Sequence, residues 1–515
     1  MKGVRLAELV ALLSLGTDLG LGQPMEHMIR TCLIALRLAD RLGLEESERR
    51  VLYYSGLLAW VGCHTDAYEQ ARWLGDDIET KRDAHYAYDF GRARDVTTFM
   101  LKHLGGAGRP LLERARVGMA FFGDGRRAAE SFAENHYRAA DELAARLGLG
   151  EEVRASLKQS FERWDGKGAF GIKGNRTLIT SRLINLADVV EVFRRTAGID
   201  AAITVARHRR GTQFDPALVD LFCQEAPVLF RDIGATASWD VIIAEEPTLT
   251  PVVTDDELDG ALEAIGEFAE LKSPWKMGHA RGVSDLAARA ATFHGLPPAE
   301  VSTLRRAALV HDIGQLGVSN TIWDKRGKLT PSEMERVRLH PYLSERMLAF
   351  SAALTPLGAI GAQHHERLDG SGYPKGLSGN AISPAARILA AADVYHAMIA
   401  ARPHRPARSP DEAAAELNAE VARGRIDAGA AAAVLRAAGH RVGRRRGWPA
   451  GLTSREVEVL RLVARGLSNK EIAATLVISP KTVGNHVEHV FAKIDVANRA
   501  MASLFAMKNG LMNDA

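Results

Sequence analysis

The sequence has little cysteine: its 515 residues include three, Cys32, Cys63 and Cys223. They lie far apart and form no Cys-x-x-Cys pair, and with their odd number this excludes a framework of disulfides. We therefore expect all three to be small, buried, apolar side chains of a protein from the reducing cytoplasm.

Long apolar runs are missing as well. The N-terminal stretch is apolar from Leu6, but Glu8 and Asp18 interrupt it and no cleavage site of small residues follows, so it does not read as a signal peptide. No segment reaches the uninterrupted length that a membrane helix needs. The expectation is a soluble cytoplasmic protein with no membrane partner.

Runs of β-branched residues are also scarce. Ala and Leu dominate, and apolar residues recur three and four positions apart, which predicts an all-α fold. A chain of 515 residues is too long for one hydrophobic core, so we expect about three domains. The net charge is only +3, but from Arg441 onward Lys and Arg exceed Asp and Glu by roughly six, an asymmetry typical of nucleic-acid-binding segments.

The first four-fifths of the chain contain an internal repeat. Five blocks recur in the same order: Glu26-His27 as Gly278-His279, Gly43-Leu44 as Gly295-Leu296, and residues 57–62, 162–168 and 186–190 as 309–314, 366–372 and 391–395. Counted back from the Asp-Gly pair of the fourth block, His136 coincides with His340, so the first copy carries an insertion of about 48 residues after Ala59. Two Ala- and Leu-rich helical segments can agree by chance, but five ordered blocks make that reading the weaker one.

The repeat and the composition together divide the chain. We predict two helical modules followed by a four-helix DNA-binding domain, with acidic and basic linkers rich in Pro or Gly between them. The predicted segments are residues 1–244 for the first copy, 245–256 for a linker, 257–440 for the second copy, 441–451 for a basic linker and 452–515 for the last domain.

The second copy carries a set of residues that suits metal ions. Each lies in a segment that reads as a helix, near its end or a Gly turn; they are His279, His311, Asp312, His340, His364, His365 and Asp393. Imidazole and carboxylate ligands suit Fe, Mn or Zn. An adjacent His-Asp pair lets the carboxylate bridge two ions about 3.5–4 Å apart, which can share a hydroxide and hold a phosphodiester for in-line attack.

These motifs carry a family resemblance. His311-Asp312 together with Gly372-Tyr373-Pro374 resembles the HD-GYP subgroup of the HD phosphohydrolases over about 180 residues. The resemblance implies hydrolysis of cyclic di-GMP to the linear dinucleotide or GMP at an iron or manganese centre, with the seven residues as ligands and Asp312 as the bridge. It also implies that Arg402 and Arg405 grip phosphate and that the Gly372-Tyr373-Pro374 loop lines the pocket; the alternatives are a solvated arginine pair and a plain turn.

Two positions depart from the family pattern. Gln315 stands where the family usually has Lys, and a neutral amide can hydrogen-bond substrate but cannot neutralise phosphate charge. Trp275 stands where members with a third metal place Glu, so we predict two divalent ions, Fe or Mn rather than Zn. Three hypotheses stay open: a working cyclic di-GMP phosphodiesterase, a sensor that binds without turnover, and hydrolysis of another phosphoester.

The first copy has lost this set. Ala59-Trp60 replaces the His-Asp pair and Ser160-Phe161 replaces the His-His pair, while His27, His136 and Asp188 survive. We interpret it as a pseudoenzyme that serves dimerisation or ligand sensing. A bolder alternative is a mononuclear site restored by His64 and Asp66.

The last domain reads as a helix-turn-helix. Thr453 and Glu456 form a capping-box pattern, Gly466 ends the first helix, and Ser479 caps a third helix, with Ile478 as the apolar residue of the turn. The segment 452–499 closely resembles the LuxR-type transcription regulators, which implies binding of double-stranded DNA as a homodimer. The expected DNA-binding residues are Lys470, Ser479, Lys481, Thr482, Val483, Asn485, His486 and Lys493, with lysines on phosphates and Val483 and Asn485 on base edges.

Overall fold

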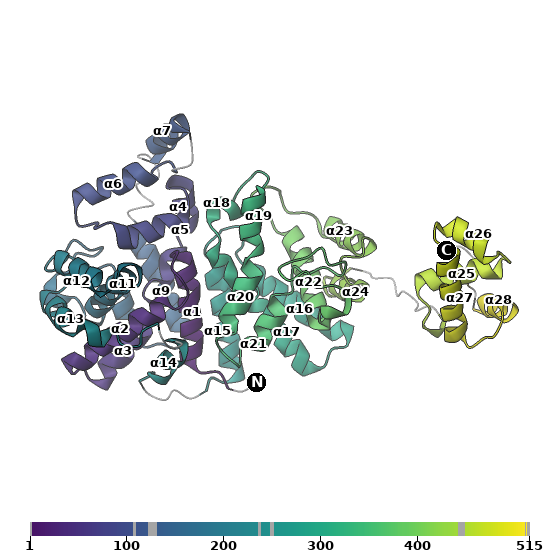
Figure 1. The fold of residues 1–515 in the computed structure, drawn as a ribbon, viewed down its shortest axis with the longest axis horizontal. Coiled ribbons are helices and arrows are strands. Elements are labelled where there is room, and N and C mark those ends of the chain that lie inside the picture. The colour runs from purple at the N-terminus through teal and green to yellow at the C-terminus, as the bar shows by residue number, and fades with distance from the viewer. Residues whose placement is uncertain are drawn as a thin grey trace. The chain divides into compact units, whose positions relative to one another are not determined.

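The computed structural model describes residues 3–106, 110–121, 131–234, 238–247, 252–440, 449–509 and 511. Over these residues the structure is helical and contains no named strand, only three isolated β-bridges, which confirms the all-α prediction (Figure 1). The chain divides into two compact units, Met1–His440 and Arg441–Ala515. None of the described helices combines the length and hydropathy required to cross a membrane.

The helices of the first copy follow one another in this order: α1 (Leu6–Gly20), α2 (His27–Leu42), α3 (Glu46–Leu58), η1 (Val61–His64), α4 (Ala67–Trp73), α5 (Asp77–Arg82), η2 (Asp83–Ala87), α6 (Ala93–His103), α7 (Leu111–Ala120), α9 (Phe132–Arg146), α10 (Glu151–Lys158), η4 (Gly174–Arg176), α11 (Ile179–Ala197), α12 (Ile199–His208), α13 (Pro216–Leu229) and α14 (Ser238–Ala244).

The second copy contains α15 (Asp255–Glu270), α16 (His279–His294), α17 (Pro298–Val310), η5 (Ile313–Gly317), α18 (Asn320–Trp323), α19 (Pro331–Arg338), α20 (His340–Leu348), α21 (Thr355–Gly361), η6 (Gly379–Ala381), α22 (Pro384–Ile399), α23 (Pro410–Ala422) and α24 (Ala428–Ala437). Where the first copy has α4 to α7 ahead of His136, the second has only α18 and α19 ahead of His340, so the predicted insertion is folded into helices.

The repeat is visible in the backbone. Helices α2 and α16 both end at a left-handed glycine, Gly43 with φ 66° and Gly295 with φ 90°. A Cβ atom on Gly62 would lie 2.2 Å from the carbonyl oxygen of His136, and one on Gly314 would lie 2.1 Å from that of His340. Only glycine permits this approach. The same close contact therefore occurs at the same place in both copies, which confirms the internal repeat.

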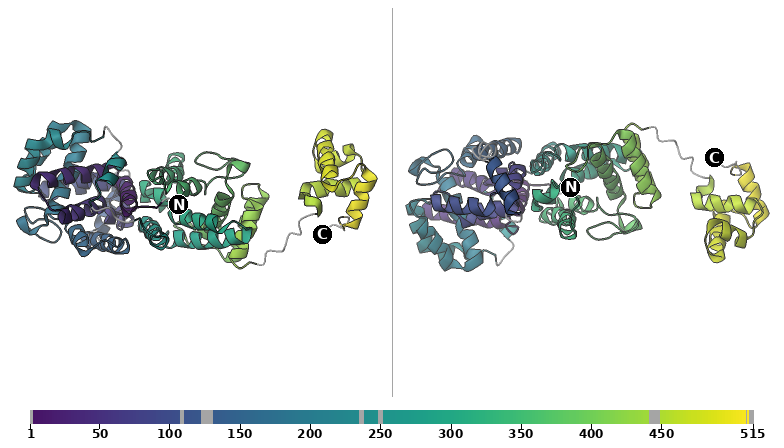
Figure 2. Two further views of the ribbon diagram at one scale, coloured as in Figure 1. Left: turned by 90° about the horizontal axis from the view of Figure 1, so that it is seen from below. Right: turned by 90° about the horizontal axis from the view of Figure 1, so that it is seen from above.

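One hydrophobic core extends across both copies, and a further buried cluster lies within the second copy. Helix α1 packs against η5 and α20 of the second copy, and a Cβ atom on Gly16 would lie 2.8 Å from Leu316 Cδ1. The same buried cluster joins Leu9 of α1 with Leu316 and Leu348. Figure 2 shows the purple helices of the first copy beside the green helices of the second. Among the described residues of the predicted linker 245–256, α15 begins at Asp255, and the cluster that contains Leu9 and Leu316 continues on both sides of the linker.

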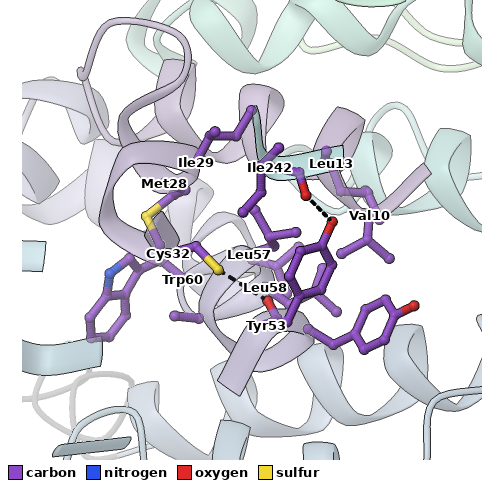
Figure 3. Close-up of a cluster of buried hydrophobic side chains, with 14 of the residues drawn as sticks. Val10, Leu13, Met28, Ile29, Cys32, Tyr53, Leu57, Leu58, Trp60 and Ile242 are labelled. Carbon is purple, nitrogen blue, oxygen red and sulfur yellow. Dashed lines mark hydrogen bonds between the residues drawn. The ribbon is translucent and has the colours of Figure 1, made fainter. Parts of the chain in front are cut away.

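Within the first copy this core is built around α1, α2 and α3. Tyr53 donates its hydroxyl to the carbonyl of Ile242, 3.0 Å away, and Cys32 Sγ lies 3.4 Å from the Tyr53 carbonyl (Figure 3). All three cysteines are free thiols, and Cys32 and Cys63 are buried as predicted, whereas Cys223 is half-buried because it lies at the edge of α13.

A buried ion cluster also joins the copies. The carboxylate of Asp77, in the insertion, lies 3.1 Å from Lys81 Nζ and 3.2 Å from Lys272 Nζ of the second copy. It also accepts hydrogen bonds from Ser319 and from the backbone N–H of Asn320. Burial opposes ionisation, but the two ammonium groups outweigh it and hold the pKa of Asp77 below its usual range. Removal of one partner from such a buried ion pair strongly destabilises the folded state, because the other charge then remains buried without compensation.

His27 forms a second buried ion cluster at the start of α2. Its Nε2 lies 2.9 Å from Asp188 and its Nδ1 lies 2.6 Å from Glu191. Burial lowers the pKa of His27, but the two carboxylates outweigh it and raise that pKa from 6.5 to about 10. The imidazole is therefore a cation at neutral pH, held between two acids.

The C-terminal unit contains α25 (Ser454–Ala464), α26 (Asn469–Leu476), α27 (Pro480–Ile494) and α28 (Arg499–Lys508). Each of the first three begins with the predicted type of cap: Thr453 accepts from Glu456 N–H, Ser468 from Glu471 N–H and Ser479 from Thr482 N–H. Ile478 packs against the buried cluster beneath the turn, as expected. The arginine run of the predicted basic linker lies outside the described residues.

Val477 is strained at the turn between α26 and α27. Its φ is 54° and its side chain is 90% exposed. A β-branched residue rarely adopts the left-handed region, because Cβ approaches the following carbonyl. The position favours Asn or Gly, and no packing holds the valine side chain in return.

The His27 cluster predicts a pH dependence. His27 binds more protons folded than unfolded between pH 6.5 and about 10, so its stabilisation is complete below pH 6.5 and is lost as the pH rises through that window. The melting temperature of wild type should exceed that of His27→Gln most at pH 6.5, by an amount equivalent to a few kcal/mol, and the gap should narrow toward pH 9.5. Calorimetry of both, with the exposed His404→Gln as control, measures this. A gap that is constant with pH contradicts the assignment.

The strain at Val477 predicts a stabilising substitution. Val477→Asn should stabilise the C-terminal unit by roughly 1 kcal/mol, because Asn tolerates the left-handed conformation and nothing is unpacked. The matched variant Val477→Ala keeps the Cβ atom but has no polar group that could hydrogen-bond to the nearby backbone, so it should gain less stability than Val477→Asn. Thermal unfolding followed by circular dichroism measures both. A lower melting temperature for Val477→Asn would show that the turn tolerates valine without cost.

Candidate metal centre and DNA-binding surface

Six of the seven predicted ligands lie at or near helix ends, as the sequence indicates. The seventh, Asp393, lies within α22. His279 and His340 are the first residues of α16 and α20. His311 caps the C-terminal end of α17 and Asp312 begins η5. His364 and His365 lie in the turn after α21. These elements pack around one buried point, so residues separated by up to 114 positions come into contact.

Two carboxylates lie at the middle of this cluster. Asp312 Oδ1 is 3.1 Å from His340 Nε2, 3.4 Å from His364 Nε2 and 4.0 Å from His311 Nε2. Asp393 Oδ1 is 3.0 Å from His279 Nε2 and 3.9 Å from His311 Nε2. His365 joins the group through its ring, 4.0 Å from that of His364.

The backbone fixes how three of the rings face. The Nδ1 atoms of His311, His340 and His364 lie 2.7, 2.5 and 2.7 Å from the carbonyls of the residues three positions earlier. An Nδ1–H that donates to a carbonyl leaves the lone pair on Nε2 free, which is the arrangement that orients metal-binding histidines. His311 Nε2 is buried and finds no hydrogen-bond partner among the described residues, so it fits a metal ligand.

The protonation states also suit metal ions. Burial lowers the pKa of His311 to about 4, and it lowers the pKa values of His340 and His365 as well, so these rings are neutral. Burial would raise the pKa of Asp312, but Lys276 and the surrounding imidazoles outweigh it and hold that pKa well below its usual range. Neutral imidazole and ionised carboxylate are the forms that ligate metals.

The ligand atoms fall into two groups. His340, His364 and His365 form one, and His279, His311 and Asp312 form the other, each with atoms within 4.8 Å of one another. Over the described residues no such group lies in the first copy. In the first copy Trp60 stands at the position of Asp312, and its ring lies 5.2 Å from that of Phe161. His64 is fully buried against Phe268, and the groups of possible metal ligands among the described residues include neither His64 nor Asp66.

Several neighbours of the centre were not found from the sequence. Lys276 Nζ lies 2.9 Å from Asp312 Oδ2 and 4.2 Å from the centre of the Trp323 ring. His396 Nδ1 lies 3.0 Å from His279 Nδ1. Glu270 accepts hydrogen bonds from the N–H groups of Gly278 and Ala280, which positions the start of α16. A lysine one turn ahead of His279 was the available signal for Lys276.

Gln315 does not take the place expected for it. Its side chain is 3% exposed, and its amide nitrogen donates to the Ala269 carbonyl, 3.1 Å away, at the end of α15. The amide therefore bonds the backbone and is not offered to a substrate.

The predicted phosphate-binding arginines differ in their contacts. The Arg405 guanidinium donates to four backbone carbonyls at and beyond the end of α22, those of Ala397, Met398, Ala400 and Pro406, so it caps that helix. Arg402 makes a single 3.4 Å contact to the Trp275 carbonyl and keeps donors available. Only Arg402 therefore remains suited to a phosphate.

The Gly372-Tyr373-Pro374 loop contacts the centre directly. The Tyr373 ring lies 4.7 Å from that of His365, and the backbone N–H of Tyr373 donates to the His365 carbonyl. A Cβ atom on Gly372 would lie 2.4 Å from the Arg367 nitrogen, so glycine is required there. The loop lies against a predicted ligand, which supports a wall of the pocket over a plain turn.

The predicted DNA-binding residues separate into exposed and occupied ones. Lys470, Ser479, Lys481, Thr482 and Asn485 are exposed and His486 is half-buried. Val483 lies on the face of α27 that packs on α25 and α26, and it is fully buried in the cluster with Val459 and Ile472. The prediction that Val483 reads base edges is therefore wrong. Lys493 donates to Glu456, 2.8 Å away, and so joins α27 to α25.

The comparisons with known proteins agree with this architecture. Residues 263–429 match the HD domain family, and residues 450–506 match the luxR family of bacterial regulatory proteins. The chain is 33% identical over 415 residues to the 3′3′-cGAMP-specific phosphodiesterase 3 of Vibrio cholerae, which covers 80% of this chain and 90% of that relative. It is 42% identical over 146 residues to a cyclic di-GMP phosphodiesterase response regulator of Xanthomonas campestris, covering 28% of this chain and 38% of the relative.

A solved structure shares the fold of most of the chain. The crystal structure of a cyclic GMP-AMP specific phosphodiesterase from V. cholerae matches with a TM-score of 0.57 and 28% identity, covering 84% of this chain and 97% of that one. The chain belongs to the HD-GYP-type HD-domain phosphohydrolases, as a tandem whose first copy is degenerate, and it also carries a LuxR-type helix-turn-helix domain.

Proposed function

We propose that this protein is a transcription regulator whose second copy hydrolyses a 3′,3′-linked cyclic dinucleotide at two divalent metal ions. The observation that carries the proposal is the convergence of the seven predicted ligands on one buried point, with six of them in two groups and Asp393 beside His279. Cyclic di-GMP is the substrate that the motifs imply, while the relative that spans most of the chain is named for 3′3′-cGAMP. Both are cyclic dinucleotides with the phosphodiester that such a centre attacks.

The residues of the centre have separable tasks in this proposal. His279, His311 and Asp393 would hold one ion and His340, His364 and His365 the other, with Asp312 placed to serve both. The ions, when bound, supply Lewis acidity and a hydroxide near neutral pH. Iron or manganese suits this nitrogen and oxygen set. Tyr373 and Arg402 lie at the border of the substrate space beside the metal ligands, where they orient the dinucleotide.

Lys276 supplies the positive charge that Gln315 cannot. The ammonium group lies at the edge of the centre beside Asp312, on a different chain segment from the position of the usual family lysine. An ammonium there can pair with a non-bridging phosphate oxygen and stabilise the charge that develops in the transition state. Trp323 beneath it holds the lysine in place.

The C-terminal unit binds double-stranded DNA through α27 in this proposal. Lys470 and Lys481 contact phosphates, Thr482 and Asn485 reach base edges, and Ser479 and His486 lie at the start of that surface. A homodimer places two such helices on neighbouring half-sites.

A second candidate function is that of a sensor that binds the cyclic dinucleotide without turnover. The observation in its favour is Gln315, whose amide is bonded to the backbone. The complete ligand set favours the enzyme, because binding alone does not require all seven residues.

The repeat offers a matched pair of variants that tests the function. His340→Ala should lower hydrolysis of cyclic di-GMP or 3′3′-cGAMP by on the order of 100-fold or more and reduce the metal content. The equivalent His136→Ala in the first copy should leave turnover within a few-fold of wild type. Anaerobically purified protein, assayed by product chromatography and metal analysis, measures both. Tight binding of either dinucleotide with no product supports the sensor, and neither binding nor product points to another phosphoester.

The role of Lys276 has its own test. Lys276→Met should lower kcat by roughly 10 to 1,000-fold while the metal content stays at the wild-type value, because the lysine acts on developing charge and is not a ligand. Lys276→Arg keeps the charge and should recover part of the rate. Steady-state kinetics with metal analysis measures this. Equal loss for Met and Arg, or loss of metal, would contradict a role in charge stabilisation.

A further inference from the structure

The first copy contains a large cavity at the place of the lost metal centre. It encloses about 580 Å³, within the range of small-molecule sites. Trp60 and Phe161, which replace Asp312 and His365, both line it, as does Asp188, the counterpart of Asp393. The remaining walls come largely from α4 to α7, the insertion that the second copy lacks.

Aromatic rings dominate its lining. Although only 6% of the chain is aromatic, the cavity is lined by Trp60, Trp73, Tyr88, Phe99, Phe132 and Phe161, among others. Trp60 packs 5.2 Å from Phe161, and Phe161 packs 5.5 Å from Phe132, so the rings form a continuous surface. A planar molecule in the cavity can stack against the face of this surface.

Few of the charged groups that line the cavity are free to meet a ligand. Arg163 bonds Asp89 at 2.7 Å and Asp165 at 3.2 Å, Lys81 pairs with Asp77, and the exposed Lys167 donates to the Gly91 carbonyl. Among the acids of the lining, Asp188 pairs with His27 and Asp66 accepts a hydrogen bond from Asn135. A ligand with two phosphates would find only Lys167 without a salt bridge among the described cations of the lining, so the lining disfavours a cyclic dinucleotide.

Polar atoms of the lining residues lack partners. Trp60 is 4% exposed and Thr80 is 2% exposed, yet neither Trp60 Nε1 nor Thr80 Oγ1 finds a hydrogen-bond partner among the described residues. An unsatisfied buried donor costs roughly 1–3 kcal/mol. A carbonyl or hydroxyl on a bound molecule would satisfy such groups after a small rotation of the side chains.

We infer that the first copy binds a neutral, planar aromatic molecule bearing a hydrogen-bond acceptor in this cavity. The aromatic rings offer a surface for stacking, and the indole N–H of Trp60 is a hydrogen-bond donor. The lining disfavours polyanions, because it carries carboxylates and leaves little positive charge free. The inference is independent of the metal centre, so it stands or fails separately from the proposed hydrolysis.

Two fluorescent probes test the inference on the full-length protein. The neutral 6-propionyl-2-(dimethylamino)naphthalene, a planar ring system with a carbonyl acceptor, should bind saturably at one site per chain. The anionic 8-anilinonaphthalene-1-sulfonate should bind at least about tenfold more weakly, because the lining offers its sulfonate little free positive charge. His340→Ala should leave probe binding unchanged. Equal binding of the two probes, or displacement of the neutral probe by cyclic di-GMP, would overturn the neutral class of ligand.

Variants locate the site. Phe161→Ala should weaken binding of the neutral probe by at least about tenfold through loss of the stacking ring, whereas Phe293→Ala, at a half-exposed ring on α16, should not. Ala84→Trp fills the cavity without removing any contact and should have the same effect as Phe161→Ala. Melting curves confirm that each variant is folded. Probe affinity that is unchanged by both Phe161→Ala and Ala84→Trp would overturn the site.

Discussion

A single buried carboxylate, that of Asp312, imposes the strictest constraint on this structure. An ionised group out of water must be surrounded by compensating charge and hydrogen-bond donors. Here they come from separate elements: Lys276 ahead of α16, His340 on α20 and His364 after α21. The tight approach of Gly314 to the His340 carbonyl brings η5 directly against α20 and so places Asp312 beside His340.

The two copies show what one helical scaffold can hold. In the second, an acid and imidazoles converge on a polar centre. In the first, Trp60 and Phe161 occupy the equivalent positions, and the surviving His27 and Asp188 are bound into an ion cluster with Glu191. The backbone contacts at Gly62 and Gly314 are nevertheless the same. Chemistry at this place is therefore a property of the side chains and not of the packing that presents them.

The sequence was sufficient for the helices, the repeat and the metal-type residues, because these depend on periodicity, on order and on residue identity. It was not sufficient for the direction of individual side chains. Val483 packs into the interior, Lys493 pairs with Glu456 at the surface, and Arg405 turns back onto the end of α22, all of which only packing decides. Lys276 was missed because one lysine ahead of His279 is too weak a signal by itself. The shared core was missed because an acidic linker reads as a boundary.

The packing of α1 has an evolutionary consequence. Its residues close the core of the catalytic-type copy, with Gly16 fitted against Leu316. A duplicate that loses its reactive groups is ordinarily free to be deleted. Here deletion of the first copy would leave the apolar side chains beneath η5 and α20 open to water, so the second copy depends on the first as scaffolding whatever chemistry the first retains.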